Sequence, residues 1–296
     1  MILQKYYGCK VVGFSNSRET IWIKDGIEDT NKHIYIDIYV ADPKVICIDQ
    51  HIIAFNKAHN EEIFSYKTKL NPNLHRRRTF IGDMESDYYH KYPFGTVHFL
   101  ITLMAKEGIN VELPNLTKSY QIPQAERNGQ NISINAGHII LRADDALFST
   151  LSVYRDNALD WWGWLDRKRE IPAINELRNF IDDCDSSKAS TYKDNMTAFF
   201  KALGCDGIDG AFDTVTDVNG QLLPKVEAYK NVICKIVGMD LDLPQFYKIH
   251  KGQYAIKMVR SQSNMDILNA ENLYSYAFIF GPGSKRDNFS YTINMK

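Results

Sequence analysis

HIYIDIYVADPKVICIDQH, residues 33–51, is the stretch that decides the fold of this chain. It contains two short apolar segments, Ile34–Val40 and Val45–Ile48, whose Ile, Val and Tyr residues predict buried strands. Asp37 lies inside the first segment, and Asp49 directly follows the second. A carboxylate in such a place costs free energy unless it is hydrogen-bonded, paired or bound to a metal ion. Because acids at strand ends near a histidine often form sites at the carboxyl edge of an α/β sheet, the stretch predicts a metal or phosphate site.

The connection between the two segments, Ala41-Asp42-Pro43-Lys44, restricts how they can be arranged. A crossover between parallel strands normally needs about a dozen residues, usually with a helix. We therefore expect two strands that are either not adjacent in the sheet or linked in an unusual way.

The composition describes an ordinary globular protein. The chain has 296 residues, of which 44% are hydrophobic and 24% charged, enough for one large domain or two modest ones. Its net charge of -1 gives no overall attraction to nucleic acid or membrane, so a nucleic-acid groove would have to be a local basic patch. The five cysteines form no C-x-x-C pair, and the sequence contains neither a signal peptide nor an apolar run of membrane-spanning length. These features predict a soluble cytoplasmic protein with reduced thiols and no membrane contact.

Two further segments are candidate phosphate-binding sites. Residues 67–80, KTKLNPNLHRRRTF, are predicted to be a loop with the most basic cluster of the chain. This loop is either simply solvated or grips phosphate through the guanidinium groups of Arg76, Arg77 and Arg78. The second segment is the predicted turn GPGSKR, where backbone N–H groups and charge can hold phosphate. Its candidate residues are Gly281, Gly283, Ser284, Lys285 and Arg286.

Another pair of acids follows the apolar run GHIIL, residues 137–141. The run predicts a short buried strand, and Ala146–Leu165 predicts a helix after it. Asp144 and Asp145 lie between the two. Either acid could cap the helix or bind a metal ion, and one of the pair could do each.

The rest of the chain predicts helices and strands in alternation. Helices are expected over Tyr92–Gly108, with His98 as a packed residue, and over Asn195–Leu203 and Lys225–Val237. Asn219-Gly220 predicts a hairpin turn. Strands are expected over Tyr254–Val259 and Phe289–Ile293, with a helix or helix–strand pair between them.

A polar break at residues 182–191, DDCDSSKAST, is the best candidate linker. It predicts an α/β domain over residues 1–182 and a smaller α/β domain over residues 192–296.

Taken together, the motifs resemble those of the DHH phosphoesterase superfamily, which includes RecJ-type exonucleases, nanoRNases, cyclic-dinucleotide phosphodiesterases and family II pyrophosphatases. IYID resembles the strand that carries a metal-bridging aspartate in that family, and VICIDQH resembles the Asp-His-His motif. GHIILRADDALF resembles the fourth motif, and FIFGPGSKRDNFSYTI stands where the family has its glycine-rich substrate-binding segment.

The resemblance implies a mainly parallel sheet in the first domain and a cleft between the two domains for a nucleotide or a short nucleic acid. It implies that Mn²⁺ or Mg²⁺ is bound by Asp37, Asp49 and one of Asp144 and Asp145, and that Asp49 and His51 take part in catalysis. The arginine cluster and the glycine-rich turn would then bind substrate.

The chain also departs from the family's pattern. The segment after the first strand, FSNSRET, contains no aspartate, Gln50 replaces a usual metal ligand, and Ser284 replaces a histidine. These departures predict an incomplete metal site, because an amide is a poor ligand for a transition metal.

Three hypotheses follow from this mixture. The first is a degenerate copy of the fold that binds a nucleotide, a nucleic-acid end, a protein partner or a second copy of itself. The second is an active Mn²⁺- or Mg²⁺-dependent phosphodiesterase or exonuclease. The third is an unrelated α/β protein that acts as a partner subunit.

Overall fold

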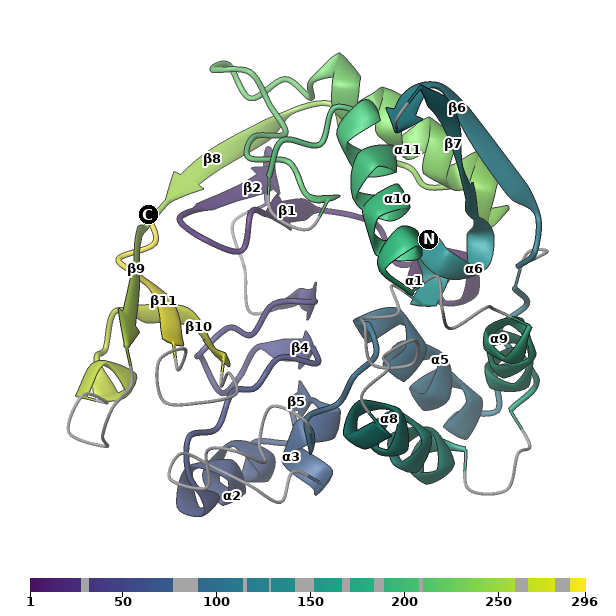
Figure 1. Cartoon of the computed structure of the whole chain (residues 1–296). Coiled ribbons are helices and arrows are strands. Elements are labelled where there is room, and N and C mark those ends of the chain that lie inside the picture. Colours follow the sequence, from purple (N-terminus) through teal and green to yellow (C-terminus); the bar gives the residue numbers. More distant parts are fainter. Residues whose placement is uncertain are drawn as a thin grey trace. The chain divides into compact units, whose positions relative to one another are not determined.

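The computed structural model describes most of the chain, and its helices and strands are drawn in Figure 1. The described residues are 1–27, 32–76, 90–113, 116–127, 129–141, 152–166, 171–183, 189–207, 210–258, 266–279 and 288–296. They form two compact units. Unit 1 contains residues 1–16, 22–25 and 93–248, and unit 2 contains residues 17–21, 26–92 and 249–296.

Unit 2 contains a small parallel sheet built mainly from the stretch of residues 33–51. Its strands are β3 (Ile34–Ile36), β4 (Ile46–Ile48) and β5 (Lys69–Leu70), in the order β3-β4-β5. The first two strands are adjacent and parallel, although only residues 37–45 join them. Of the two predicted alternatives, the structure therefore has adjacent strands joined by an unusually short connection. The first strand is shorter than the predicted Ile34–Val40 because Asp37 adopts a left-handed backbone conformation, with a φ of 61°, which ends the extended run.

The C-terminal part of the chain adds an antiparallel sheet to the same unit. It consists of β9 (Gln253–Met258), β10 (Leu273–Ile279) and β11 (Asn288–Ile293), in the order β10-β11-β9. A short 3-10 helix, η5 (Asp266–Asn269), precedes β10, so the predicted helix–strand pair and the final strands are confirmed.

One hydrophobic core joins the two halves of unit 2. Tyr39, Ile53 and Ile63 pack with Phe278 and Phe289 from the antiparallel sheet. Helix α2 (Lys57–Ser65) contributes Ile63 and contacts the short helix α3 (Pro72–Arg76). The side chain of Asn56 accepts a hydrogen bond from the backbone N–H of His59 and so caps α2 at its N-terminus.

Unit 1 is mainly helical. Its helices are α1 (Ile2–Tyr7), α5 (Thr96–Lys106), α6 (Ala136–Leu141), α8 (Ser152–Leu165), α9 (Pro172–Asp182), α10 (Ala189–Ala202) and α11 (Pro224–Val237). An antiparallel hairpin, β6 (Ser119–Arg127) and β7 (Gln130–Asn135), packs against α10. The remaining sheet has the order β1 (Gly13–Ser15), β2 (Thr20–Lys24), β8 (Tyr247–Lys251), and the boundary between the units falls within β2 and β8.

Several predictions for unit 1 agree with the structure. The predicted helices over residues 195–203 and 225–237 coincide closely with parts of α10 and α11, and α5 forms most of the predicted helix over residues 92–108. His98 of α5 is fully buried between the rings of Phe94 and Trp162, as expected for a packed residue. The chain also reverses at Asn219-Gly220, where the N–H of Gly220 donates to the carbonyl oxygen of Asp217.

The fold class is mixed α/β, but the predicted mainly parallel sheet is wrong. The small β3-β4-β5 sheet is parallel, whereas β6-β7 and β10-β11-β9 are antiparallel. The predicted strand over residues 137–141 is also wrong, because this run forms α6. A short apolar run is compatible with a strand or with a buried helix. Here the run directly follows the end of β7, and the N–H of Gly137 in the first turn of α6 donates to the carbonyl oxygen of Leu116.

The two compact units do not coincide with the segments 1–182 and 192–296. Residues 93–248 lie together in unit 1 on both sides of that boundary, and residues 249–296 lie in the same unit as residues 26–92. The stretch that carries Asp37 and Asp49 is therefore far in sequence from the antiparallel sheet of its own unit.

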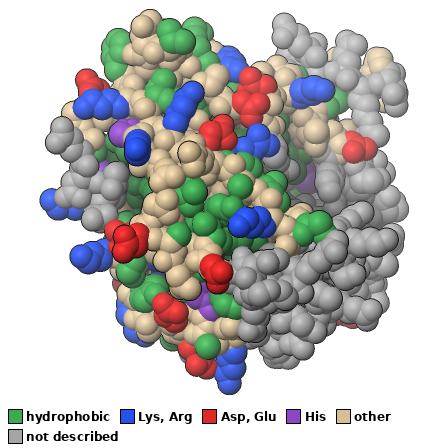
Figure 2. Space-filling model, turned by 90° about the vertical axis from the view of Figure 1, so that its left-hand side faces the viewer, with side chains coloured by type: hydrophobic (Ala, Val, Ile, Leu, Met, Phe, Trp, Pro, Cys, Tyr) green, Lys and Arg blue, Asp and Glu red, His purple; other side chains and the backbone are tan. Residues whose placement is uncertain are grey.

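The surface carries both signs of charge. On the face shown in Figure 2, the described Lys and Arg side chains alternate with Asp and Glu, and hydrophobic side chains lie among them. This mixture agrees with the net charge of -1. Among the helices described, none combines the length and the apolar character needed to cross a membrane.

Candidate metal centre

Polar side chains follow all three strands of the parallel sheet, each at the point where its strand ends. Asp37 follows β3, Asp49 follows β4, and Asn71 follows β5. Because the strands are parallel and adjacent, their carboxyl ends lie at one edge of the sheet. The backbone ladder continues past the strands: the N–H of Asp37 donates to the carbonyl oxygen of Ile48 (2.9 Å), and the N–H of Asp49 donates to that of Leu70 (3.0 Å).

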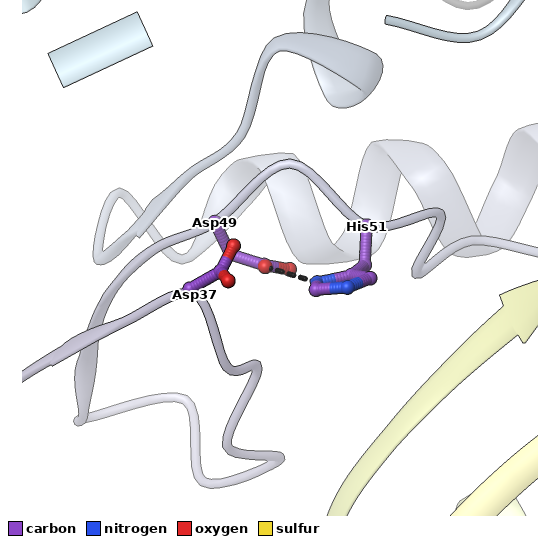
Figure 3. Close-up of side chains that lie close together, drawn as sticks. All are labelled: Asp37, Asp49 and His51. Carbon is purple, nitrogen blue, oxygen red and sulfur yellow. Dashed lines mark hydrogen bonds and ion pairs between the residues drawn. The ribbon is translucent and has the colours of Figure 1, made fainter. Parts of the chain in front are cut away.

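Asp37, Asp49 and His51 converge at this edge (Figure 3). One potential ligand atom from each residue lies within 4.8 Å of those of the other two. Within the described part of the chain, this is the group of acidic, histidine or cysteine side chains that could hold a metal ion. The sequence predicts Asp37 and Asp49 as ligands of one metal site together with Asp144 or Asp145, and gives His51 a catalytic role at that site.

The three side chains differ in their access to solvent. The side chain of Asp49 is 1% exposed, that of His51 is 42% exposed, and Asp37 is exposed. The site therefore has a buried carboxylate at its base and two groups that solvent or a ligand can reach.

The imidazole of His51 is bound directly to the buried carboxylate. Its Nδ1 lies 2.6 Å from Oδ1 of Asp49. Burial acts to lower the pKa of His51, but the charge of Asp49, its hydrogen bond and the charge of Asp37 outweigh burial and raise the pKa to about 9. The metal-free site thus holds a proton on His51 at neutral pH, which partly balances the two carboxylates.

A pair of buried asparagines holds the segment from Asp49 to His51 in place. Asn71 and Asn73 are 1% and 2% exposed. Nδ2 of Asn71 donates to the carbonyl oxygen of His51 (2.8 Å) and lies 3.4 Å from Oδ2 of Asp49. Nδ2 of Asn73 donates to the carbonyl oxygen of Gln50 (2.7 Å), and its Oδ1 accepts from the N–H of Tyr92 (2.9 Å).

The donor set suits a divalent metal ion. Two carboxylates and one imidazole are typical ligands of Mn²⁺, and carboxylate oxygen is the preferred protein ligand of Mg²⁺. In an octahedral Mg²⁺ site, neighbouring ligand atoms are about 3 Å apart and opposite ones about 4.2 Å, so a triad whose ligand atoms lie within 4.8 Å would contract on binding an ion. Asp37, Asp49 and His51 are therefore the residues that would hold it.

Most other predicted site residues lie outside the described residues. These are Asp144 and Asp145, Arg77 and Arg78, and Gly281, Gly283, Ser284, Lys285 and Arg286. Arg76 is the last residue of α3. The roles predicted for these residues remain predictions.

Sequence reasoning missed the asparagines. The composition of residues 67–80 predicts a loop, whereas the segment contains β5 and α3. Asn71 and Asn73 surround Pro72 directly after the apolar Leu70, and polar residues at the end of a third short strand are the signal that could have identified them.

Comparison with known proteins gave no match: no family model, no curated protein and no solved structure matches this chain.

Replacing Asn71 by Ala is expected to weaken both the fold and the site. The change removes the donor to His51 and Asp49 from a buried position, which costs about 1–3 kcal/mol of unfolding free energy. Loss of such an outer partner also lowers metal affinity by about 10–100-fold. Denaturant unfolding and Mn²⁺ titration measure the two effects.

Asn60→Ala is the control, because Nδ2 of Asn60 donates to the carbonyl oxygen of Leu74 in the same unit (3.0 Å) and not to the triad. Equal Mn²⁺ affinity in the two variants would contradict the role given to Asn71.

The titration of His51 provides a second test. Its pKa of about 9 in the folded state exceeds the ordinary 6.5, so its protonation stabilises the metal-free fold below pH 6.5, and this contribution disappears as the pH rises through 9. Metal must displace this proton, so affinity for Mn²⁺ is expected to rise over the same interval. An NMR titration of the His51 Cε1 proton measures the midpoint, which Asp49→Asn is expected to lower. A midpoint at or below 6.5 in the wild type would show that the two carboxylates do not act on the ring.

Proposed function

We propose that the carboxyl edge of the β3-β4-β5 sheet binds one divalent ion, Mn²⁺ or Mg²⁺, and that the site binds the phosphate of a nucleotide or of a nucleic-acid end. The observation that carries this proposal is the convergence of Asp37, Asp49 and His51 within 4.8 Å. Two carboxylates placed side by side repel each other, so a cation between them supplies the charge that the site lacks.

A phosphate ligand follows from the chemistry of such an ion. A divalent ion held by few protein ligands keeps coordination positions for the oxygen atoms of phosphate. His51 binds Asp49 through Nδ1, which leaves Nε2 as the ring atom that can contact the ion or a phosphate oxygen. Its partial exposure supports this second role.

Membership of the DHH phosphoesterase superfamily is part of this proposal. It rests on the order of the motifs in the sequence, and it is supported by the position of Asp37 and Asp49 at neighbouring strand ends. The same resemblance favours nucleotides and short nucleic acids over other phosphate compounds.

Binding is favoured over hydrolysis for this site. Hydrolysis by two metal ions needs several ligands that hold the ions about 4 Å apart, and the described cluster contains three ligand residues. Gln50 stands between Asp49 and His51 where the family usually has a histidine ligand. An active phosphodiesterase is the alternative, in which the ion would activate water and stabilise charge on the phosphate.

One set of measurements tests the proposal. Asp37→Asn removes a carboxylate but keeps a side chain that tolerates the left-handed backbone at this position. Isothermal titration with Mn²⁺ is expected to give about one ion per wild-type chain and an affinity at least about tenfold lower for the variant. The matched control is Glu61→Gln, an acid of α2 in the same unit whose side chain is 67% exposed and which lies outside the triad.

Nucleotide binding and hydrolysis are then measured with and without Mn²⁺. We expect Mn²⁺-dependent binding of short oligonucleotides in the wild type and its loss in Asp37→Asn. Hydrolysis of bis-p-nitrophenyl phosphate that is lost in the same variant would favour the active enzyme. Absence of Mn²⁺ binding in the wild type would refute the proposed site.

A further inference from the structure

A buried positive charge lies in the sheet that carries the candidate metal centre. Lys69 belongs to β5, two residues before Asn71, and it is only 5% exposed. A charged group is rarely buried unless it is fully hydrogen-bonded, because its desolvation is costly. Burial indeed acts to lower the pKa of Lys69.

The ammonium group of Lys69 is hydrogen-bonded to three backbone carbonyls. Nζ donates to the carbonyl oxygens of Val40 (2.8 Å), Asp42 (2.7 Å) and Val45 (2.8 Å). These three short bonds match the three N–H donors of an ammonium group, and Nζ also lies 3.5 Å from Sγ of Cys47. Nζ also lies 5.1 Å from the centre of the Tyr39 ring, within the range of a cation–π interaction.

All three carbonyls belong to one segment, the connector of residues 37–45 between β3 and β4. A parallel connection this short has no helix to satisfy its carbonyl groups internally. Lys69 supplies these donors from the neighbouring strand, where it pairs in register with the buried Cys47. The connector is thus folded around the Lys69 ammonium group.

The connector begins with Asp37, which has a left-handed backbone conformation and whose carboxylate lies close to that of Asp49. It leads into β4, which ends directly before Asp49. A change in its path would therefore move one site carboxylate relative to the other.

We propose that Lys69 is a positioning residue for the metal centre: by binding the carbonyls of Val40, Asp42 and Val45, it fixes the connector and so sets the separation of the Asp37 and Asp49 carboxylates. This inference rests on the proposed function, since the ion is the ligand for which the separation matters. It adds a residue that does not touch the ion.

A purely structural role for Lys69 makes a different prediction. If Lys69 only stabilised unit 2, its loss would lower the unfolding free energy and leave the folded site intact. A positioning role predicts a change in the site of the folded protein, at temperatures well below unfolding.

Lys69→Met is the direct test, because Met has similar length and no N–H donors. Two readouts are made on the full chain: the Mn²⁺ affinity, and hydrogen–deuterium exchange of the amides of residues 37–45 in metal-free protein. We expect an affinity about tenfold lower or more, as for loss of an outer partner of a metal site, together with faster exchange in the connector.

Two controls separate positioning from charge and from stability. Lys57→Met removes the same charge from an exposed residue of the same unit, whose side chain is 82% exposed. Asn56→Ala removes the N-cap of α2 and so destabilises unit 2 at a site outside the connector. Both controls are expected to keep the wild-type Mn²⁺ affinity and the wild-type exchange of residues 37–45.

If Lys69→Met does not fold, Lys69→Gln, which retains amide donors, is measured in the same way. It is expected to show a smaller loss of Mn²⁺ affinity and a smaller rise in exchange of the connector.

The outcomes distinguish this inference from the proposed function. If the folded Lys69 variant binds Mn²⁺ with the wild-type affinity, the positioning role is overturned. The proposed metal site is not affected by that result. An affinity loss equal to that of Asn56→Ala would also overturn the positioning role. Failure of the wild type itself to bind Mn²⁺ would refute the proposed function, and the positioning role would fall with it, whatever the exchange of the connector.

Discussion

The buried carboxylate of Asp49 is the constraint on which the arrangement of unit 2 depends. A negative charge at the end of β4 needs partners, and the structure supplies them on both oxygens, with His51 on one and Asn71 on the other. These partners require the residues after β4 and β5 to be held at short range. The parallel pairing of β4 with β5 provides this, since it brings the two strand ends to one edge. Removing either partner would leave a charged group buried without its full set of bonds.

The connector between β3 and β4 also depends on a buried charged group. It joins two adjacent parallel strands without a helix, and it does so with a left-handed residue at its start and a lysine ammonium group inside it. Left-handed backbone at a residue other than glycine costs free energy and is often found at functional sites. Here the costly residue is Asp37, the second carboxylate of the triad. In the proposal made above, this residue and the buried Lys69 together position the Asp37 carboxylate.

Part of this arrangement could be predicted from the sequence. Asp37 and Asp49 are recognisable because each interrupts or ends an apolar run, and His51 because it follows within two residues. The antiparallel C-terminal strands are also recognisable, since they are long enough to show their composition.

The length of β3 cannot be predicted, because nothing in the sequence IYID indicates that the aspartate adopts a left-handed backbone conformation. Lys69 and Asn71 escape notice because β5 has two residues, too few for any periodicity, and a buried lysine looks like a solvated one in sequence. The arrangement of the chain into compact units depends on pairings between residues far apart in sequence, such as Ile52 with Phe278, which local patterns do not encode.

Anomalous X-ray diffraction from crystals grown with Mn²⁺ tests most directly whether a single divalent ion lies between Asp37, Asp49 and His51, because it locates the ion without reference to activity. We expect an anomalous peak about 2–2.5 Å from a carboxylate oxygen of each aspartate and from a ring nitrogen of His51. A structure in which the triad carries no peak at a saturating Mn²⁺ concentration, or in which the ion is bound only elsewhere, would contradict the proposed site.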